Sequence, residues 1–71
     1  MNTWKYVAAG KRADLYDEDG NQLGIVYEDA LGDCHAMFRD PDGKLVNIGG
    51  STKLFYMEAK QLIEVTARLN Q

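Results

Sequence analysis

The chain of 71 residues has few of the side chains on which catalysis and metal binding most often depend. It contains one cysteine (Cys34), one histidine (His35) and one proline (Pro41). A single cysteine forms no disulfide within its own chain, so stability has to come from the hydrophobic core, and the reducing cytoplasm is the expected location. Structural zinc needs four ligands, and Cys34 with His35 are too few. We therefore expect no metal, no cofactor and no special chemistry at this pair.

Long apolar runs and known catalytic motifs are missing as well. No apolar run approaches the roughly 18 residues that a membrane-spanning helix needs. The N-terminal sequence "MNTWKYVAAG" lacks the unbroken hydrophobic region of a signal peptide. There is no nucleophile elbow and no phosphate-binding glycine loop, and the abundant acids are expected in exposed turns, where they stay ionised. The sequence predicts a non-enzyme that does not enter a membrane.

The pattern of apolar residues predicts one domain with a two-layer α+β fold. A hydrophobic content of 45% argues against disorder. Alternation and turn signals predict strands at about 3–9, 13–16, 23–27, 34–39 and 45–48, and a 3.6-residue period predicts a helix at about 53–69. The expected fold class is α+β, an antiparallel β-meander of four to five strands with one C-terminal α-helix packed on one face.

The two faces of the predicted sheet are both partly apolar. Alternation would bury Leu15, Ile25, Phe38 and Ile48 beneath the helix and place Tyr16, Val26, Met37 and Leu45 on the other face. The helix would bury Leu54, Phe55, Ala59, Leu62, Ile63, Val65, Thr66 and Leu69, with Ser51 or Thr52 as its cap or a later start near Met57. An open face that is not cleanly polar indicates self-association into a homo-oligomer, or a partner.

Two stretches share the spelling Asp-x-Asp-Gly between apolar runs: "YDEDGNQL" and "RDPDGKLV". The longer stretch "DEDGNQLGIVYE" has oxygen-bearing residues where a calcium-binding EF-hand loop has them, but its sixth position is Gln22 rather than glycine. In the second copy a cation, Lys44, takes the fifth position, where it would repel a metal ion. Both stretches therefore predict hairpin turns and not calcium sites.

Acidic residues concentrate in the middle of the chain. Residues 13–42 contain nine acids and a single base, Arg39. In a meander the two Asp-x-Asp-Gly turns project at the same end, which would gather an acidic pole composed of Asp17, Glu18, Asp19, Asp40 and Asp42. We predict that a basic protein partner binds through this pole or through the open sheet face with Tyr16, Val26 and Met37.

One resemblance rests on Trp4 and on three segments that follow it: "RADLYDEDGNQLGIVYED", "HAMFRDPDG" and "EAKQLIE". It resembles the very short proteins of phages and prophages, which string hairpins of the form Asp-x-Asp-Gly ahead of a single amphipathic helix. The match covers most of the chain. It implies an accessory protein that binds and inhibits a host protein, and it assigns no functional residue.

Single-stranded nucleic acid is the alternative partner. The strand aromatics Trp4, Tyr6, Tyr16, Tyr27 and Phe38 could stack on bases. The order of sheet and then helix also resembles the arm-type DNA-binding domain of tyrosine integrases. Such domains need basic residues along their strands, and the acidic balance of this chain argues against nucleic acid.

Overall fold

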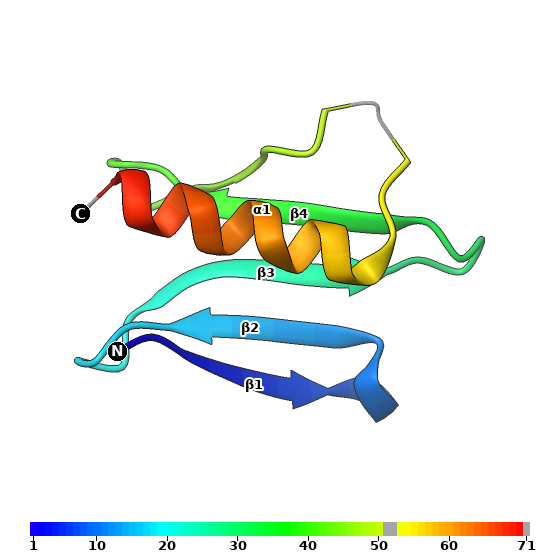
Figure 1. The fold of residues 1–71 in the computed structure, drawn as a ribbon, viewed down its shortest axis with the longest axis horizontal. Helices are drawn as coiled ribbons and strands as arrows, with labels where there is room; N and C mark the ends of the chain where they lie inside the picture. The colour runs from blue at the N-terminus through cyan, green and yellow to red at the C-terminus, as the bar shows by residue number, and fades with distance from the viewer. Residues whose placement is uncertain (51–52, 71) are drawn as a thin grey trace.

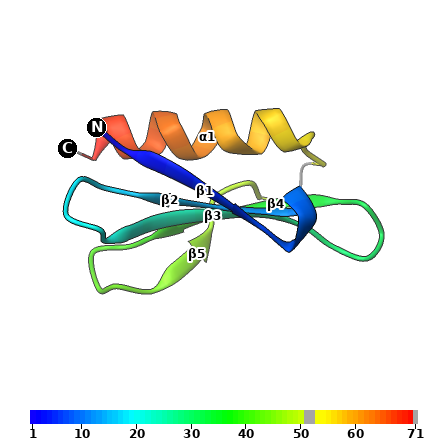
Figure 2. The ribbon, with the colours of Figure 1, turned by 90° about the horizontal axis from the view of Figure 1, so that it is seen from below.

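The computed structural model describes residues 1–50 and 53–70. Five strands form one open antiparallel sheet in the order β1-β2-β3-β4-β5, and the helix α1 lies across one face of it (Figures 1 and 2). The elements are β1 Thr3–Val7, β2 Arg12–Tyr16, β3 Gln22–Glu28, β4 Cys34–Arg39, β5 Leu45–Asn47 and α1 Tyr56–Leu69. The predicted α+β meander with one C-terminal helix is confirmed.

Three hairpins of the sheet use one and the same turn. In each, the amide of a glycine donates to the carbonyl of an aspartate three residues earlier, in the pairs Gly20–Asp17, Gly32–Asp29 and Gly43–Asp40. All three glycines have φ between 84° and 85°, a left-handed conformation that other residues adopt only with strain. The sequence pattern revealed the first and third copies. The second copy, "DALGD", has leucine in place of the second aspartate, so it does not match the pattern Asp-x-Asp-Gly.

The core lies between α1 and strands β3 and β4, with β2 contributing from one side. The sheet supplies Leu15, Val26, Cys34, Ala36 and Phe38, and the helix supplies Ala59, Ile63 and Ala67. Alanines at two of the three buried helix positions, spaced four residues apart around Ile63, let the helix approach the sheet closely. Gly24 of β3 serves the same purpose, because a Cβ there would lie 2.8 Å from the carbonyl oxygen of Met37 and 3.0 Å from Cγ2 of Ile63.

The predicted faces of β3 are wrong. Val26 is fully buried beneath the helix, whereas Ile25 pairs with Asp14 and Met37 on the open face, the face opposite α1. The cause is an irregularity in the pairing of β2 with β3, where the register shifts by one residue and leaves Leu23 without a partner. Leu23 packs against the core as an extra residue, and from Gly24 onward the alternation is reversed.

The helix begins at Tyr56, one residue from the alternative start near Met57 and later than the start at about residue 53. The residues Ser51 and Thr52, predicted as caps, lie outside the described residues. Instead, the amide of Phe55 donates to Oε1 of Glu58 at 2.9 Å, which satisfies one of the amides at the helix start.

The buried stripe of α1 is also narrower than predicted. Phe55, Val65 and Leu69 were expected in the core, but they are 80%, 41% and 79% exposed. The single helix covers only the middle of the sheet, so its flanks have no opposing strand to pack against.

Candidate functional site: the acidic pole and the open sheet face

The predicted acidic pole forms at one end of the molecule. The turn between β2 and β3 and the turn between β4 and β5 lie at the same end of the sheet, together with the N-terminus and the last turn of α1 (Figure 1). Asp17 and Asp40, one from each turn, line a single groove with Asn70 of the helix end. The bases at this end include the N-terminal ammonium, Arg39, Lys44 and Arg68 in the last turn of α1, against the five carboxylates of the pole.

The first aspartate of each turn has a structural role. Oδ1 of Asp17 accepts hydrogen bonds from the amides of Asp19 and Asn21, both at 2.9 Å. Oδ1 of Asp40 accepts the equivalent bonds from Asp42 and Lys44 at 3.0 and 2.9 Å. The bond from the backbone of Asn21 is the main cause that lowers the pKa of Asp17. Both carboxylates are therefore already engaged by the amides of their own turns.

The third position of the turn needs no acid. The third-position residues Asp19 and Asp42 are exposed, and the turn at Asp29 carries Leu31 at the same position with the same backbone. The second position is equally free, since it holds Glu18, Ala30 and Pro41 in the three copies. Glu18 contacts the N-terminal ammonium of Met1. The carboxylates of Asp19 and Asp42 thus project from the pole without a role in its folding.

An apolar groove of about 660 Å³ adjoins the pole. It exists because α1 packs on β3 and β4 and leaves the helix-side surface of β5 uncovered, so that Val46 is 41% exposed. We call it the β5 groove, and its lining residues are Asn2, Asp17, Leu23, Phe38, Arg39, Asp40, Pro41, Val46, Ile48, Thr66, Ala67 and Asn70. Sequence reasoning missed it, because its existence depends on which strands the helix covers.

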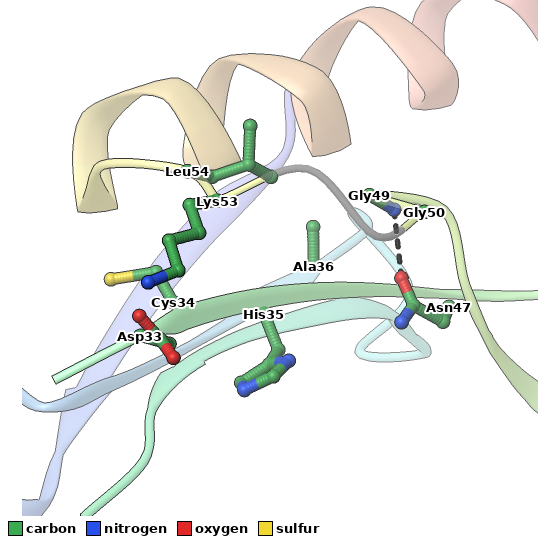
Figure 3. A pocket seen from close by; sticks show the side chains of 9 residues that line it. All are labelled: Asp33, Cys34, His35, Ala36, Asn47, Gly49, Gly50, Lys53 and Leu54. Atoms are coloured by element: carbon green, nitrogen blue, oxygen red, sulfur yellow. Dashed lines mark hydrogen bonds between the residues drawn. The ribbon is translucent and has the colours of Figure 1, made fainter. Parts of the chain in front are cut away.

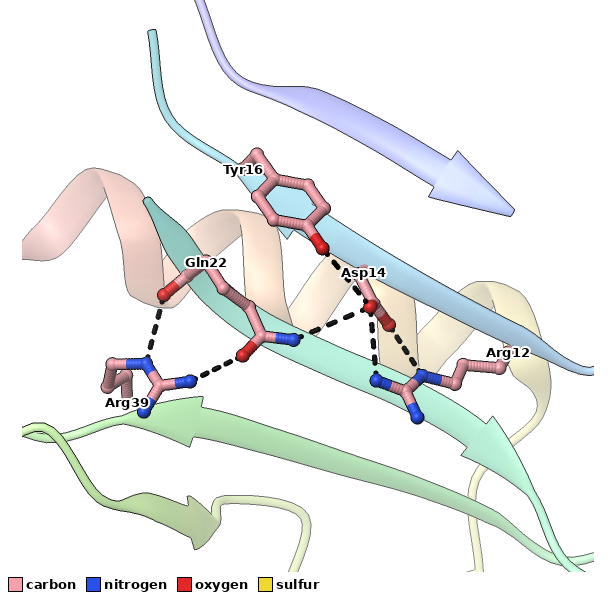
Figure 4. Close-up of polar contacts among 5 residues, drawn as sticks. All are labelled: Arg12, Asp14, Tyr16, Gln22 and Arg39. Carbon is pink, nitrogen blue, oxygen red and sulfur yellow. Dashed lines mark hydrogen bonds and ion pairs between the residues drawn. The ribbon is translucent and has the colours of Figure 1, made fainter. Parts of the chain in front are cut away.

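The open sheet face carries a network of polar side chains rather than an apolar surface (Figure 4). Asp14 is only 6% exposed, and its carboxylate accepts two bonds from Arg12, at 2.8 and 3.1 Å. Gln22 donates to the same carboxylate at 3.4 Å and is itself bound by Arg39. The bond to Asp14 is the main cause that raises the pKa of Arg12. Tyr16 joins the network, since its hydroxyl donates to Oδ2 of Asp14 at 3.5 Å.

The aromatic residues predicted to stack on nucleic acid are divided between the two faces. Trp4 packs against the core on the helix side and donates from Nε1 to Oε1 of Glu64 at 2.8 Å, and Phe38 is buried beneath the helix. Tyr16 and Tyr27 remain on the open face. Tyr27 stacks on His35, with ring centroids 4.8 Å apart and planes at 23°.

The open face also holds more bases than acids. Lys5 lies with its Nζ 5.0 Å from the ring of Tyr16, and register pairing places Lys5 on the same face as Asp14. Arg12 and Arg39 belong to the same face, with Asp14 as their acidic neighbour in the strands. The middle of the chain is acidic in sequence, but its acids lie mostly in the turns, and the strands carry more bases than acids on this face.

Of the three predicted partner-binding residues on the sheet, two lie on the open face. Tyr16 and Met37 are there and half-buried. Val26 is not, because its side chain is in the core and has no exposed surface. Ile25 occupies the open face at that point, and it is 8% exposed.

A second, smaller hollow of about 210 Å³ lies beside Cys34 and His35 (Figure 3). The two residues are neighbours on β4, so their side chains point to opposite faces of the sheet. Burial is the main cause that raises the pKa of the Cys34 thiol, and nearby carboxylates add to it. His35 instead contacts Asp29, with Nε2 and Oδ2 2.7 Å apart. The geometry separates thiol from imidazole, and it keeps the thiol protonated.

Comparison of the chain with protein-family models, with curated proteins and with solved structures gives no match. Within residues 1–50 and 53–70, no helix is long and apolar enough to cross a membrane. In the same described residues, no three or more His, Cys, Asp and Glu side chains are grouped as a metal ion would require.

Proposed function

We propose that this protein is a small, non-enzymatic protein-binding module that takes a basic partner at the acidic pole. The observation that carries the proposal is the position of Asp19 and Asp42. Both are exposed, and both occupy a turn position that the copy at Asp29 fills with leucine. Folding of the turn therefore does not account for these two acids.

Two further features support a basic partner. The C-terminus of α1 ends beside the pole at Asn70, and the negative end of a helix dipole favours cations. The bases of the pole are partly engaged already, since Arg39 donates to the carbonyl of Gly43 and to Gln22. The phage resemblance would make that partner a host protein, and the open face would be the surface of a homo-oligomer.

The test uses the double variant Asp19→Asn/Asp42→Asn, which removes two charges and leaves the turn backbone intact. Immobilised wild type and variant capture proteins from a bacterial lysate at about 50 mM and about 300 mM salt. Asp33→Asn removes one charge at the opposite end of the sheet, and it is the control for the single variants Asp19→Asn and Asp42→Asn, which are measured beside the double variant. The captured partner is then purified and its affinity for each form is measured by calorimetry.

We expect the double variant to bind the partner about tenfold or more weakly than the wild type does, and high salt to lower the affinity further. Asp33→Asn should keep the affinity within about twofold of the wild-type value. Equal affinity of the wild type and the double variant would refute the proposal. The proposal would also be refuted if Asp33→Asn lowered the affinity as much as a single substitution at Asp19 or Asp42, because the effect would then follow net charge and not the position of the acid.

Single-stranded nucleic acid stays as a second candidate, favoured by one observation. Lys5, Arg12 and Arg39 share the open face with Tyr16 and Tyr27, which is the combination of cations and stacking rings that such binders use. Fluorescence anisotropy of a labelled oligothymidine at low salt, with Tyr27→Ala as the variant, tests it. No anisotropy change with the wild type would eliminate this function.

A further inference from the structure

We propose that the β5 groove binds an amphipathic helix of the partner, with basic residues at the end that lies over the acidic pole. This inference rests on the proposed function and specifies the form of its partner. The groove is the largest apolar concavity described near the pole, and its rim includes Asp17 and Asp40 with one base, Arg39, which already donates to Gly43 and Gln22. An apolar floor beside an acidic rim matches a ligand that is apolar along one stripe and basic at one end.

The floor and wall of the groove suit a helix in particular. Leu23, Phe38 and Val46 line the floor, and Thr66 with Ala67 line the wall on α1. Both wall side chains are short, so a second helix could lie beside α1 at the usual interaxial distance of about 8–10 Å. Such a helix would extend the helical layer over β5, which α1 leaves uncovered (Figure 2).

An extended peptide is less suited to this site. The strand β5 has three residues, Leu45–Asn47, and the amide of Ile48 bonds to the carbonyl of Ala36 on β4. Antiparallel alternation then directs only the backbone groups of Leu45 and Asn47 outward, too few to hold an added strand. The side chain of Asn47 is engaged too, since its Oδ1 accepts the amide of Gly49 at 2.8 Å.

A small apolar ligand also fits less well than a helix. Sites for such ligands bury about 70–90% of the ligand surface in concave, mostly enclosed pockets. The β5 groove is open along one side, and charged or polar residues, Asp17, Arg39, Asp40 and Asn70, surround its apolar floor. That arrangement provides an apolar floor with a polar rim, as protein interfaces do.

The test is a titration of the isotope-labelled full chain with synthetic peptides, followed by amide chemical shifts. The probe is a peptide of about 14 residues, with leucines at helical spacing and two lysines at one end. Three comparison probes are a peptide with glutamates for the lysines, a peptide of the same composition with leucines at every second position, and the hydrophobic dye ANS. Concentration-dependent shifts without any probe are recorded as well.

Two variants of this chain complete the experiment. Val46→Glu places a charge on the groove floor, and its matched control is Val65→Glu on the solvent side of α1, because both valines are 41% exposed. Asn70→Lys adds a positive charge at the groove rim, where a base at the helix C-terminus does not harm folding. Circular dichroism establishes that each variant is folded.

We expect the lysine peptide to shift the amides of Val46, Ile48, Thr66 and Ala67. The glutamate peptide, Val46→Glu and Asn70→Lys should each weaken binding by about tenfold, and Val65→Glu by less than about twofold. The inference is overturned if no groove amide shifts at about 1 mM peptide. It is also overturned if the alternating peptide binds better, if ANS alone reproduces the shifts, or if the shifts grow with protein concentration, which would assign the groove to a second copy.

Failure of this inference can be told apart from failure of the proposed function. If the peptides do not bind but capture of the partner still depends on Asp19 and Asp42, the groove is not the helix-binding site, while the acidic pole remains the binding surface. If capture is independent of both aspartates, the pole itself is not the binding surface.

Discussion

Replacement of Gly24 by alanine tests the packing of the helix on the sheet. The added Cβ would lie 2.8 Å from the carbonyl oxygen of Met37, and 3.0 and 3.2 Å from Cγ2 and Cδ1 of Ile63. The Ile63 side chain can move, but the Met37 carbonyl belongs to the backbone of β4 and cannot move without disturbing the β3–β4 pairing. Overpacking of a core costs about 1–3 kcal/mol. The lower entropy of the unfolded alanine chain returns about 0.4–1 kcal/mol.

The net loss should therefore be about 1–2 kcal/mol, which for a domain of this size lowers Tm by about 5–15 °C. Urea and thermal unfolding, followed by far-UV circular dichroism, measure it. The matched control is Gly49→Ala, whose Cβ would meet the end of the flexible Leu54 side chain at 3.0 Å and which also has no left-handed φ. We expect that control to change stability by less than about 0.5 kcal/mol. A loss as small for Gly24→Ala would show that the Met37 carbonyl and the Ile63 side chain leave room for a Cβ at this position.

Three further predictions concern the turns and the cysteine. Asp40→Ala should lower the free energy of unfolding by about 1–2 kcal/mol, because two backbone amides lose their acceptor. Asp42→Ala should change it by less than about 0.5 kcal/mol, and urea unfolding of both variants measures the difference. The pKa values of Asp17 and Asp29 are lowered from the ordinary value of 3.8. Both ionised carboxylates therefore stabilise the fold above pH 3.8, and this contribution is lost as the pH falls through the lowered pKa of the folded state. Carbon-detected NMR should find that both groups titrate below pH 3.8. Cys34 is 8% exposed and its pKa is raised, so at pH 8 a thiol reagent should react much faster with the urea-unfolded chain than with the folded one, and equal rates would contradict the buried position.

The strand and helix order was predictable because it depends on local signals. Each hairpin needs a glycine with positive φ, and each strand needs an apolar run, and both are visible in the sequence. The faces of β3 were not predictable in the same way. Leu23, Ile25 and Tyr27 alternate as one apolar face would, and only the irregular pairing opposite Tyr16 reverses the pattern. A shifted register is a property of two strands together, so neither strand reveals it alone.

The candidate surfaces show the same limit. The grouping of Asp17 and Asp40 at one end followed from topology alone, since alternate hairpins of a meander share an end. The β5 groove did not, because it depends on the helix lying over β3 and β4 and not over β5. The charge of the open face was also hidden, since Arg39 is distant in sequence from Lys5 and Arg12 and acidic turns lie between it and them.

The three Asp-x-x-Gly turns give an internal comparison that bears on the origin of the acidic pole. Their backbones are equivalent, yet Leu31, 87% exposed, stands in one where Asp19 and Asp42 stand in the other two. The third turn region has acids of its own, Glu28, Asp29 and Asp33, but at the third turn position an acid occurs only in the two turns that share an end with the β5 groove and the end of α1. That distribution follows a surface of the molecule rather than the rules of the turn, and this favours binding over turn formation as the role of Asp19 and Asp42.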